Sequence, residues 1–231
     1  MSKLVVREGV THFPFPASGL YLVTPDWSDD EALLNAVAAA LRGGAHAVQY
    51  RAKQRERSAQ ATREFGARLI TCCHQHAVPL LINDDIALAE VLGADGVHVG
   101  RDDATLAEAR ARLGPRAIIG ASCYDSLPRA QAAVAAGADY VAFGRFFPSR
   151  TKPSAPPARL ETLTQARHQL DVPIVAIGGV LPENASTLLT AGATVLAVVS
   201  GVFDDEPEAA ARRLVEVIAT HSGKSRNIVF Q

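Results

Sequence analysis

The sequence is poor in several features that mark particular classes of protein. Only three of its 231 residues are cysteine, and two of these, Cys72 and Cys73, are adjacent. Such a set does not form the disulfide framework of a small secreted protein, so we expect free thiols in a reducing compartment, the cytoplasm. No apolar run reaches the roughly 18 residues that a membrane-spanning helix needs.

An excess of charge of one sign is also missing. The chain carries 23 basic and 24 acidic residues, and its net charge is −1. Proteins that bind nucleic acid or anionic membranes concentrate basic side chains, so the sequence predicts neither partner. The opening MSKLVVREGVTHFPFP lacks the apolar core of a signal peptide. We therefore expect residues 1–18 to form an N-terminal arm and residues 222–231 a C-terminal tail.

Apolar, β-prone runs are what the chain has in abundance, since 48% of its residues are hydrophobic. The runs are nearly continuous in Val, Ile, Leu and Ala, which is typical of strands covered on both faces. They occupy residues 20–24, 46–51, 79–84, 96–100, 117–122, 140–145, 173–179 and 194–200. A helical pattern follows each run, so the predicted order is strand then helix, eight times.

A shorter repeat runs through this pattern. Gly-Ala pairs precede every second strand, at residues 44–45, 93–94, 137–138 and 192–193. A repeat of about two βα units fits a barrel built from duplicated pieces. The main alternative, a doubly wound sheet, usually has fewer strands and a glycine-rich turn after the first, where this chain has TPDWSDD. We therefore predict a single (β/α)8 TIM barrel over residues 19–221.

Polar residues follow nearly every predicted strand, and a barrel brings these positions to one rim, where its chemistry lies. Asp84 and Asp103 end neighbouring strands and could face one Mg²⁺, a cation that prefers oxygen ligands and retains water and substrate oxygens. The alternative for these acids is helix capping, because each precedes a predicted helix.

Basic and glycine residues complete the predicted rim. Arg51, Lys53 and Lys152 suit a polyanionic ligand such as a diphosphate, whereas solvated loop charge is the alternative, above all for Arg150. The Gly-Gly and Ser-Gly pairs at 178–179 and 200–201 allow a phosphate to approach the backbone closely. His98 could face the barrel interior, and no histidine stands ready to activate Cys123.

Seven ordered motifs between about residues 20 and 215 together resemble the thiamine phosphate synthase family. They are YLVT, VQYRAK, LLINDD, GADGVHVGRDD, GADYVAFGRFFPSRTK, PIVAIGG and VLAVVSG. The resemblance implies condensation of 4-amino-2-methyl-5-hydroxymethylpyrimidine diphosphate with 4-methyl-5-(β-hydroxyethyl)thiazole phosphate, which gives thiamine phosphate and pyrophosphate. It also implies a dissociative route that is assisted by Mg²⁺ and needs no general base.

The resemblance assigns roles to individual residues. It places the pyrimidine diphosphate on Gln49, Arg51, Lys53, Asn83, Ser122 and Lys152, and Mg²⁺ on Asp84 and Asp103. It places the thiazole phosphate on Ser149, Thr151, Gly179, Val199 and Ser200. Tyr50, Ala52 and Arg150 complete the expected substrate-binding set, and Arg51, Lys53, Lys152 and Ser122 are the expected catalytic residues. The expected partners are these small molecules, and a homo-oligomer remains open.

The chain departs from the family pattern at a few positions. Tyr50 and Ala52 stand where Leu and Glu are usual, Arg101 where Gln is common, and Arg145 where the residue is small or proline. A related thiazole isomerase would use a histidine near position 124, where this chain has tyrosine. A phosphate-binding regulator would not need Asp84, Asp103 and Lys152 together, so we favour the synthase over both alternatives.

Overall fold

The structure, a computed structural model, describes residues 6–7, 10–11, 13–51, 58–100, 106–148 and 156–228. For residues 6–7, 10–11 and 224–228 it describes the backbone alone. Ala52, Lys53, Arg101, Asp103, Ser149, Arg150, Thr151 and Lys152 therefore lie outside the described residues.

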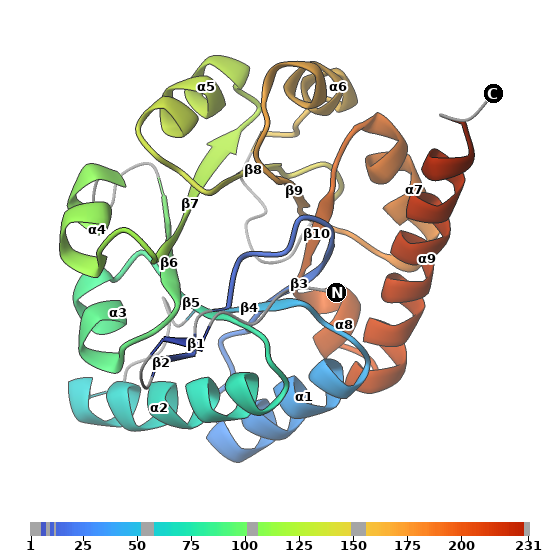
Figure 1. The fold of residues 1–231 in the computed structure, drawn as a ribbon. Coiled ribbons are helices and arrows are strands. Elements are labelled where there is room, and N and C mark those ends of the chain that lie inside the picture. The colour runs from blue at the N-terminus through green and yellow to red at the C-terminus, as the bar shows by residue number, and fades with distance from the viewer. Residues whose placement is uncertain are drawn as a thin grey trace.

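Eight parallel strands close into a barrel, and helices surround it (Figure 1). In chain order the strands are β3 Gly19–Val23, β4 Ala47–Tyr50, β5 Leu80–Asn83, β6 Gly96–Val99, β7 Ile118–Tyr124, β8 Tyr140–Gly144, β9 Ile174–Ile177 and β10 Val195–Val198. Each strand pairs with its neighbours in sequence, and β10 pairs with β3 to close the ring. The predicted (β/α)8 barrel is confirmed.

The helices lie in the outer layer. They are α1 Asp30–Arg42, α2 Ala59–Gln75, α3 Ile86–Leu92, α4 Leu106–Leu113, α5 Leu127–Ala135, α6 Leu160–Gln169, α7 Pro182–Ala191, α8 Ser200–Phe203 and α9 Pro207–Ile228. The short helix α8 was not predicted. The last helix, α9, continues beyond residue 221, the predicted end of the barrel, to Ile228. It packs between α1 and α7 and completes the helical ring (Figure 1). None of the described helices is both long and apolar enough to cross a membrane.

The apolar side chains form two layers. The larger one lies between strands and helices, where alternate strand residues meet buried helix residues such as Leu33 and Val37 of α1. The smaller one fills the barrel interior and includes Tyr21 and Tyr140. Phe15 packs against this interior layer and stacks on Tyr140, with ring centroids 3.8 Å apart. The residues just before β3 thus cover the end of the barrel where the strands begin.

The Gly-Ala repeat has a structural role. The residue after each Gly-Ala pair accepts a hydrogen bond from a backbone N–H near the start of the preceding strand. These bonds join Leu20 N to His46 Nδ1 (3.3 Å), Leu80 N to Asp95 Oδ2 (2.8 Å), Ile119 N to Asp139 Oδ2 (2.7 Å) and Ile174 N to Thr194 Oγ1 (3.0 Å). The same link therefore ties β3 to β4, β5 to β6, β7 to β8 and β9 to β10, as expected for a fourfold repeat of two βα units.

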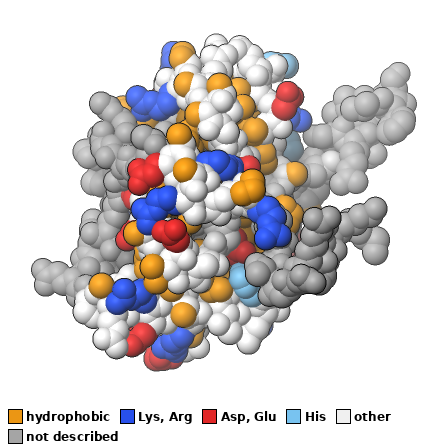
Figure 2. All heavy atoms as spheres, turned by 60° about the vertical axis from the view of Figure 1, so that its left-hand side comes forward, with side chains coloured by type: hydrophobic (Ala, Val, Ile, Leu, Met, Phe, Trp, Pro, Cys, Tyr) orange, Lys and Arg blue, Asp and Glu red, His pale blue; other side chains and the backbone are white. Residues whose placement is uncertain are grey.

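A minor antiparallel pair, β1 Val6–Arg7 and β2 Val10–Thr11, precedes the barrel. On the outer surface, charges of both signs are mixed over the face turned forward in Figure 2. Ion pairs elsewhere in the described residues also combine both signs, including Arg112 with Glu90 at 2.6 Å and Arg110 with Asp139 at 2.8 Å. This mixing matches the even charge balance of the sequence.

Candidate active site

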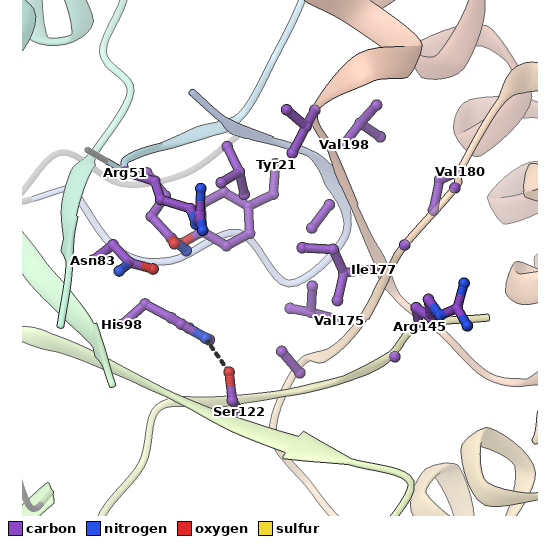
Figure 3. A pocket seen from close by; sticks show the side chains of 18 of the residues that line it. Tyr21, Arg51, Asn83, His98, Ser122, Arg145, Val175, Ile177, Val180 and Val198 are labelled. Carbon is purple, nitrogen blue, oxygen red and sulfur yellow. Dashed lines mark hydrogen bonds between the residues drawn. The ribbon is translucent and has the colours of Figure 1, made fainter. Parts of the chain in front are cut away.

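A cavity opens at the end of the barrel where the strands finish, and all eight strands contribute to its lining. Figure 3 shows two unlike walls: Arg51, Asn83, His98 and Ser122 form a polar side, and Val175, Ile177 and Val198 lie across from them. Such a site suits a ligand with an apolar body and a few directed polar groups.

Seven members of the expected substrate-binding set line this cavity. They are Gln49, Arg51, Asn83, Ser122, Gly179, Val199 and Ser200. Arg145, one of the departures from the family pattern, also belongs to the lining. The prediction that His98 faces the interior is confirmed, because this buried side chain reaches the cavity from β6.

Tyr50 is placed differently from what the sequence led us to expect. Successive strand residues point to opposite faces of the sheet, so Tyr50 faces away from the barrel interior that Gln49 enters. Its ring is 2% exposed and lies 5.5 Å from the ring of Phe65 in α2. This placement corrects the expectation that the Tyr50 side chain contacts substrate: it packs between the barrel and the helices.

Arg51 is held in place by residues that follow β3. Its Nη1 donates to Oδ2 of Asp26 at 2.9 Å, and its backbone N–H donates to Oγ1 of Thr24 at 2.9 Å. Within the described part of the chain, the other oxygen of Asp26, Oδ1, is buried and has no hydrogen-bond partner. Neither supporting residue was predicted from the sequence, although the polar residues Thr24 and Asp26 directly after a strand were a usable signal.

The two acids after β5 have separate roles. Asp85 caps α3 by accepting from the Leu88 N–H at 2.8 Å, so the capping alternative holds for this residue. Asp84 has a positive φ of 65°, which is rare without glycine, and it accepts from the N–H of Gly100 at 2.9 Å and from Asn83 Nδ2 at 2.6 Å. Its carboxylate is thereby fixed beside the end of β6.

One of the two acids that the sequence led us to expect as Mg²⁺ ligands, Asp84, lies within the described residues. Asp84 offers hard carboxylate oxygens beside Gly100, and the sequence reaches Asp103 three residues after that glycine. The described residues include no cluster of three or more His, Cys, Asp or Glu side chains that could hold a metal. The donors at hand suit a cation that takes few protein ligands and completes its shell with water and phosphate oxygens.

A continuous chain of hydrogen bonds crosses the cavity floor. Gln49 Nε2 donates to the Tyr21 hydroxyl at 2.7 Å, and this hydroxyl lies 2.9 Å from that of Tyr140. Tyr140 in turn bonds His98 Nδ1 at 2.8 Å. Figure 3 shows the last link, between His98 Nε2 and Ser122 Oγ at 2.9 Å. Two predicted substrate-binding residues are thus connected through three side chains.

Burial of both phenols raises the pKa of Tyr21 and of Tyr140 above the ordinary tyrosine value. For Tyr21, the hydrogen bonds from its partners oppose this rise but do not cancel it. Both hydroxyls therefore stay protonated at neutral pH, and each can donate one hydrogen bond.

The opposite end of the cavity is built from glycines after β9. Gly179 has a φ of 67°, and a side chain there would meet the carbonyl oxygen of Pro148 at 2.4 Å. Asn184 of α7 donates to the Gly179 carbonyl at 2.9 Å, which fixes this turn beside Ser200. The turn can therefore bring backbone close to a ligand, as the sequence analysis expected.

Comparison with known proteins gives the family. The family described as thiamine monophosphate synthase matches residues 20–202. The thiamine-phosphate synthase of Methylococcus capsulatus is 50% identical over 202 residues, covering 87% of this chain and 89% of that protein. That of Thiobacillus denitrificans is 51% identical over 193 residues, covering 82% and 89%. A solved thiamine phosphate pyrophosphorylase from Pyrococcus furiosus has a TM-score of 0.78 at 30% identity and covers 89% of this chain and 97% of that one. The chain belongs to the thiamine monophosphate synthase family.

Proposed function

We propose that the protein is a thiamine phosphate synthase, a transferase that joins the pyrimidine diphosphate to the thiazole phosphate and releases pyrophosphate. Relatives about half identical to this chain match it over nearly the whole barrel. Together with a cavity lined by Gln49, Arg51, Asn83 and Ser122, this match is the observation that carries the proposal.

The polar wall is the proposed site of the pyrimidine diphosphate. Gln49 and Ser122 hold the ring, and Arg51 binds the diphosphate through N–H groups that Asp26 does not take. Lys53 and Lys152, which lie outside the described residues, are proposed to add charge to this site. The glycine end, with Gly179, Val199 and Ser200, is the proposed site of the thiazole phosphate, to which Ser149 and Thr151 contribute.

Asp84 and Asp103 are the proposed ligands of Mg²⁺. When bound there, the ion would neutralise charge that builds on the departing diphosphate. The residues of the chain do the rest of the work. Arg51 stabilises the same developing charge, and the apolar wall around Ile177 limits the access of water to the reacting carbon.

The proposed reaction breaks the bond between the pyrimidine methylene carbon and the diphosphate oxygen, and the electron pair leaves with the diphosphate. The ring stabilises the resulting cation until the thiazole nitrogen donates its lone pair to the same carbon. No proton has to be removed, so no general base is needed. The protein has to hold the two substrates in line, which is where most of the rate gain from binding arises.

The test is pyrophosphate release from the two substrates together, from each one alone, and with EDTA. The proposal expects release that requires both substrates and Mg²⁺. Release from the pyrimidine diphosphate alone would indicate a hydrolase, and binding of thiazole phosphate without any release would favour the isomerase or the regulator. We further propose that residues 19–221 are the catalytic unit, flanked by an arm (1–18) and a C-terminal extension (222–231), and that the protein acts in the cytoplasm.

A further inference from the structure

We propose that Tyr21, Tyr140 and His98 are positioning residues that set the hydrogen-bond polarity of the ring site. Through them, Gln49 presents an acceptor to the cavity while Ser122 presents a donor. The site would therefore select a heteroaromatic ring that has one donor, such as an amino group, and one acceptor, such as a ring nitrogen. This inference rests on the proposed function, since it concerns the pyrimidine that the same site would bind.

The first bond, from Gln49 to Tyr21, determines which group donates in each later hydrogen bond of this series. Gln49 donates through Nε2, so the Tyr21 oxygen accepts there and its own hydrogen must go to its other partner, Tyr140. The Tyr140 oxygen therefore accepts from the Tyr21 hydroxyl, and the Tyr140 hydroxyl donates its own hydrogen to His98 Nδ1. The remaining ring hydrogen of His98 is therefore on Nε2.

This order determines what the two ends of the chain offer to a ligand. His98 Nε2–H donates to Ser122 Oγ, so the serine hydroxyl keeps its hydrogen for an acceptor in the cavity. At the other end, Gln49 gives one of its two Nε2 hydrogens to Tyr21, which fixes the orientation of the amide, and its carbonyl oxygen remains to accept from a donor in the cavity. One end accepts and the other donates.

Reversing every bond would exchange these two roles but would keep them opposite. A neutral chain of this kind has one hydrogen for each link, so a reversal would require the Gln49 amide to turn over and the serine hydrogen to point at His98 instead of the cavity. A ring that pairs one donor with one acceptor satisfies both ends at once. The 4-aminopyrimidine of the proposed substrate has this pairing in its exocyclic amine and adjacent ring nitrogen.

Among the residues of this hydrogen-bonded chain, Tyr140 best distinguishes the proposed positioning role from direct contact with substrate. Its side chain is 0% exposed and does not line the cavity, so it can influence a ligand through its neighbours alone. Gly120 makes room for it: a methyl group at that position would lie 1.9 Å from Tyr140 Cζ. The ring also stacks on Phe15, whose plane is inclined to it by 7°.

A double-mutant cycle between Tyr140→Phe and Ser122→Ala tests the inference with the full chain and both substrates. Tyr140→Phe should lower kcat/KM for the pyrimidine diphosphate about tenfold, mainly through KM, and leave the KM for the thiazole phosphate unchanged. In the Ser122→Ala background the same change should cost less than roughly threefold, because the link that transmits it is already lost. Tyr21→Phe, which cuts the chain elsewhere, should behave in the same way.

The matched control is Val37→Ala in α1, which removes buried apolar atoms from the layer between strands and helices and touches no hydrogen bond of the chain. It should lower Tm without changing the KM for the pyrimidine diphosphate. Equal losses from Tyr140→Phe in both backgrounds would overturn the inference, because packing alone predicts additivity. If the wild-type protein makes no thiamine phosphate, the proposed function fails instead, and the two failures are therefore distinguishable.

Discussion

Arg51 and Asp26 form an ion pair inside the rim of the barrel, with Nη1 and Oδ2 2.9 Å apart and their side chains 9% and 15% exposed. The two residues come from the ends of adjacent strands, β4 and β3. A buried guanidinium loses much of its hydration, and Asp26 replaces part of it while leaving other N–H groups of Arg51 for a ligand. The pair thus fixes the orientation of the cation before substrate binds.

Asp26→Asn should weaken binding of the pyrimidine diphosphate without unfolding the protein. The amide can still accept from Arg51 but no longer carries the charge that holds the guanidinium. We expect a loss in kcat/KM of roughly 10- to 100-fold, which corresponds to the ~1.5–3 kcal/mol of a hydrogen bond to a charged group. The matched control is Asp29→Asn, which removes an exposed carboxylate from the same loop and keeps the cap of α1. Similar losses in both variants would contradict the role of Asp26.

Asp84→Ala should lower turnover by about two orders of magnitude or more with the fold intact, because it removes a proposed ligand of Mg²⁺. The neighbouring change Asp85→Asn keeps a capping oxygen for the Leu88 N–H and should leave turnover nearly unchanged. Pyrophosphate release across a Mg²⁺ titration measures both variants. A rate for Asp84→Ala that equals the wild-type rate would remove this residue from the metal site, and the same test applies to Lys152→Ala at the diphosphate.

The cysteines should be unreactive in the folded protein. Burial raises the pKa of the Cys123 thiol to about 12 and also raises the pKa values of Cys72 and Cys73. Thiols rather than thiolates are therefore present at neutral pH, and a thiol is a poor nucleophile. Iodoacetamide at pH 8 should label Cys123 and Cys73 slowly in the native protein and rapidly in urea. Cys123→Ala should retain activity, and rapid native labelling of Cys123 with loss of turnover would contradict this prediction.

The sequence predicted the barrel well because its signals are local and repeated. Eight apolar runs and the Gly-Ala pairs each report on a few neighbouring residues, and barrel closure then follows from their number. The same reasoning located Gln49, Arg51 and Ser122, since residues at strand ends have a known position in this fold.

Side-chain direction and long-range partners were harder to predict. Tyr50 was included in the expected substrate-binding set, but strand alternation turns it outward to Phe65. The links from Asp26 to Arg51 and from Tyr140 to His98 join residues 25 and 42 positions apart. Periodicity contains no information about such pairs, because they depend on how the closed barrel brings different strands together.

The links of the Gly-Ala repeat should contribute measurably to stability. Thr194→Val removes the hydroxyl that accepts from the Ile174 N–H at 3.0 Å and leaves this partly buried donor without that bond. We expect a loss of about 1–3 kcal/mol in the free energy of unfolding, measured by urea titration. Thr220→Val is the control: its hydroxyl bonds within the exposed part of α9, so the cost should stay below about 0.5 kcal/mol. Equal costs would mean that the link at Thr194 is not stabilising.

Asp125 should make part of the stability dependent on acidic pH. Its carboxylate accepts from the Thr162 hydroxyl and from the backbone and side chain of Arg159, and it thereby joins the loop after β7 to the start of α6. Burial alone would raise the pKa of this carboxyl, but the hydrogen bonds from Thr162 and Arg159 together outweigh burial and lower it.

A pKa that is lower in the folded than in the unfolded state gives stability that is fully present above the unfolded value, near 4 for aspartate. This contribution is lost as the pH falls through the lowered folded value. The stability difference between the wild-type protein and Asp125→Asn should therefore be constant from pH 7 to pH 5 and should shrink below about pH 4. Urea titrations at several pH values measure this difference, and the exposed Asp171→Asn serves as the control. A difference that grows toward low pH would reverse the sign of the argument and exclude Asp125 as the stabilising carboxylate.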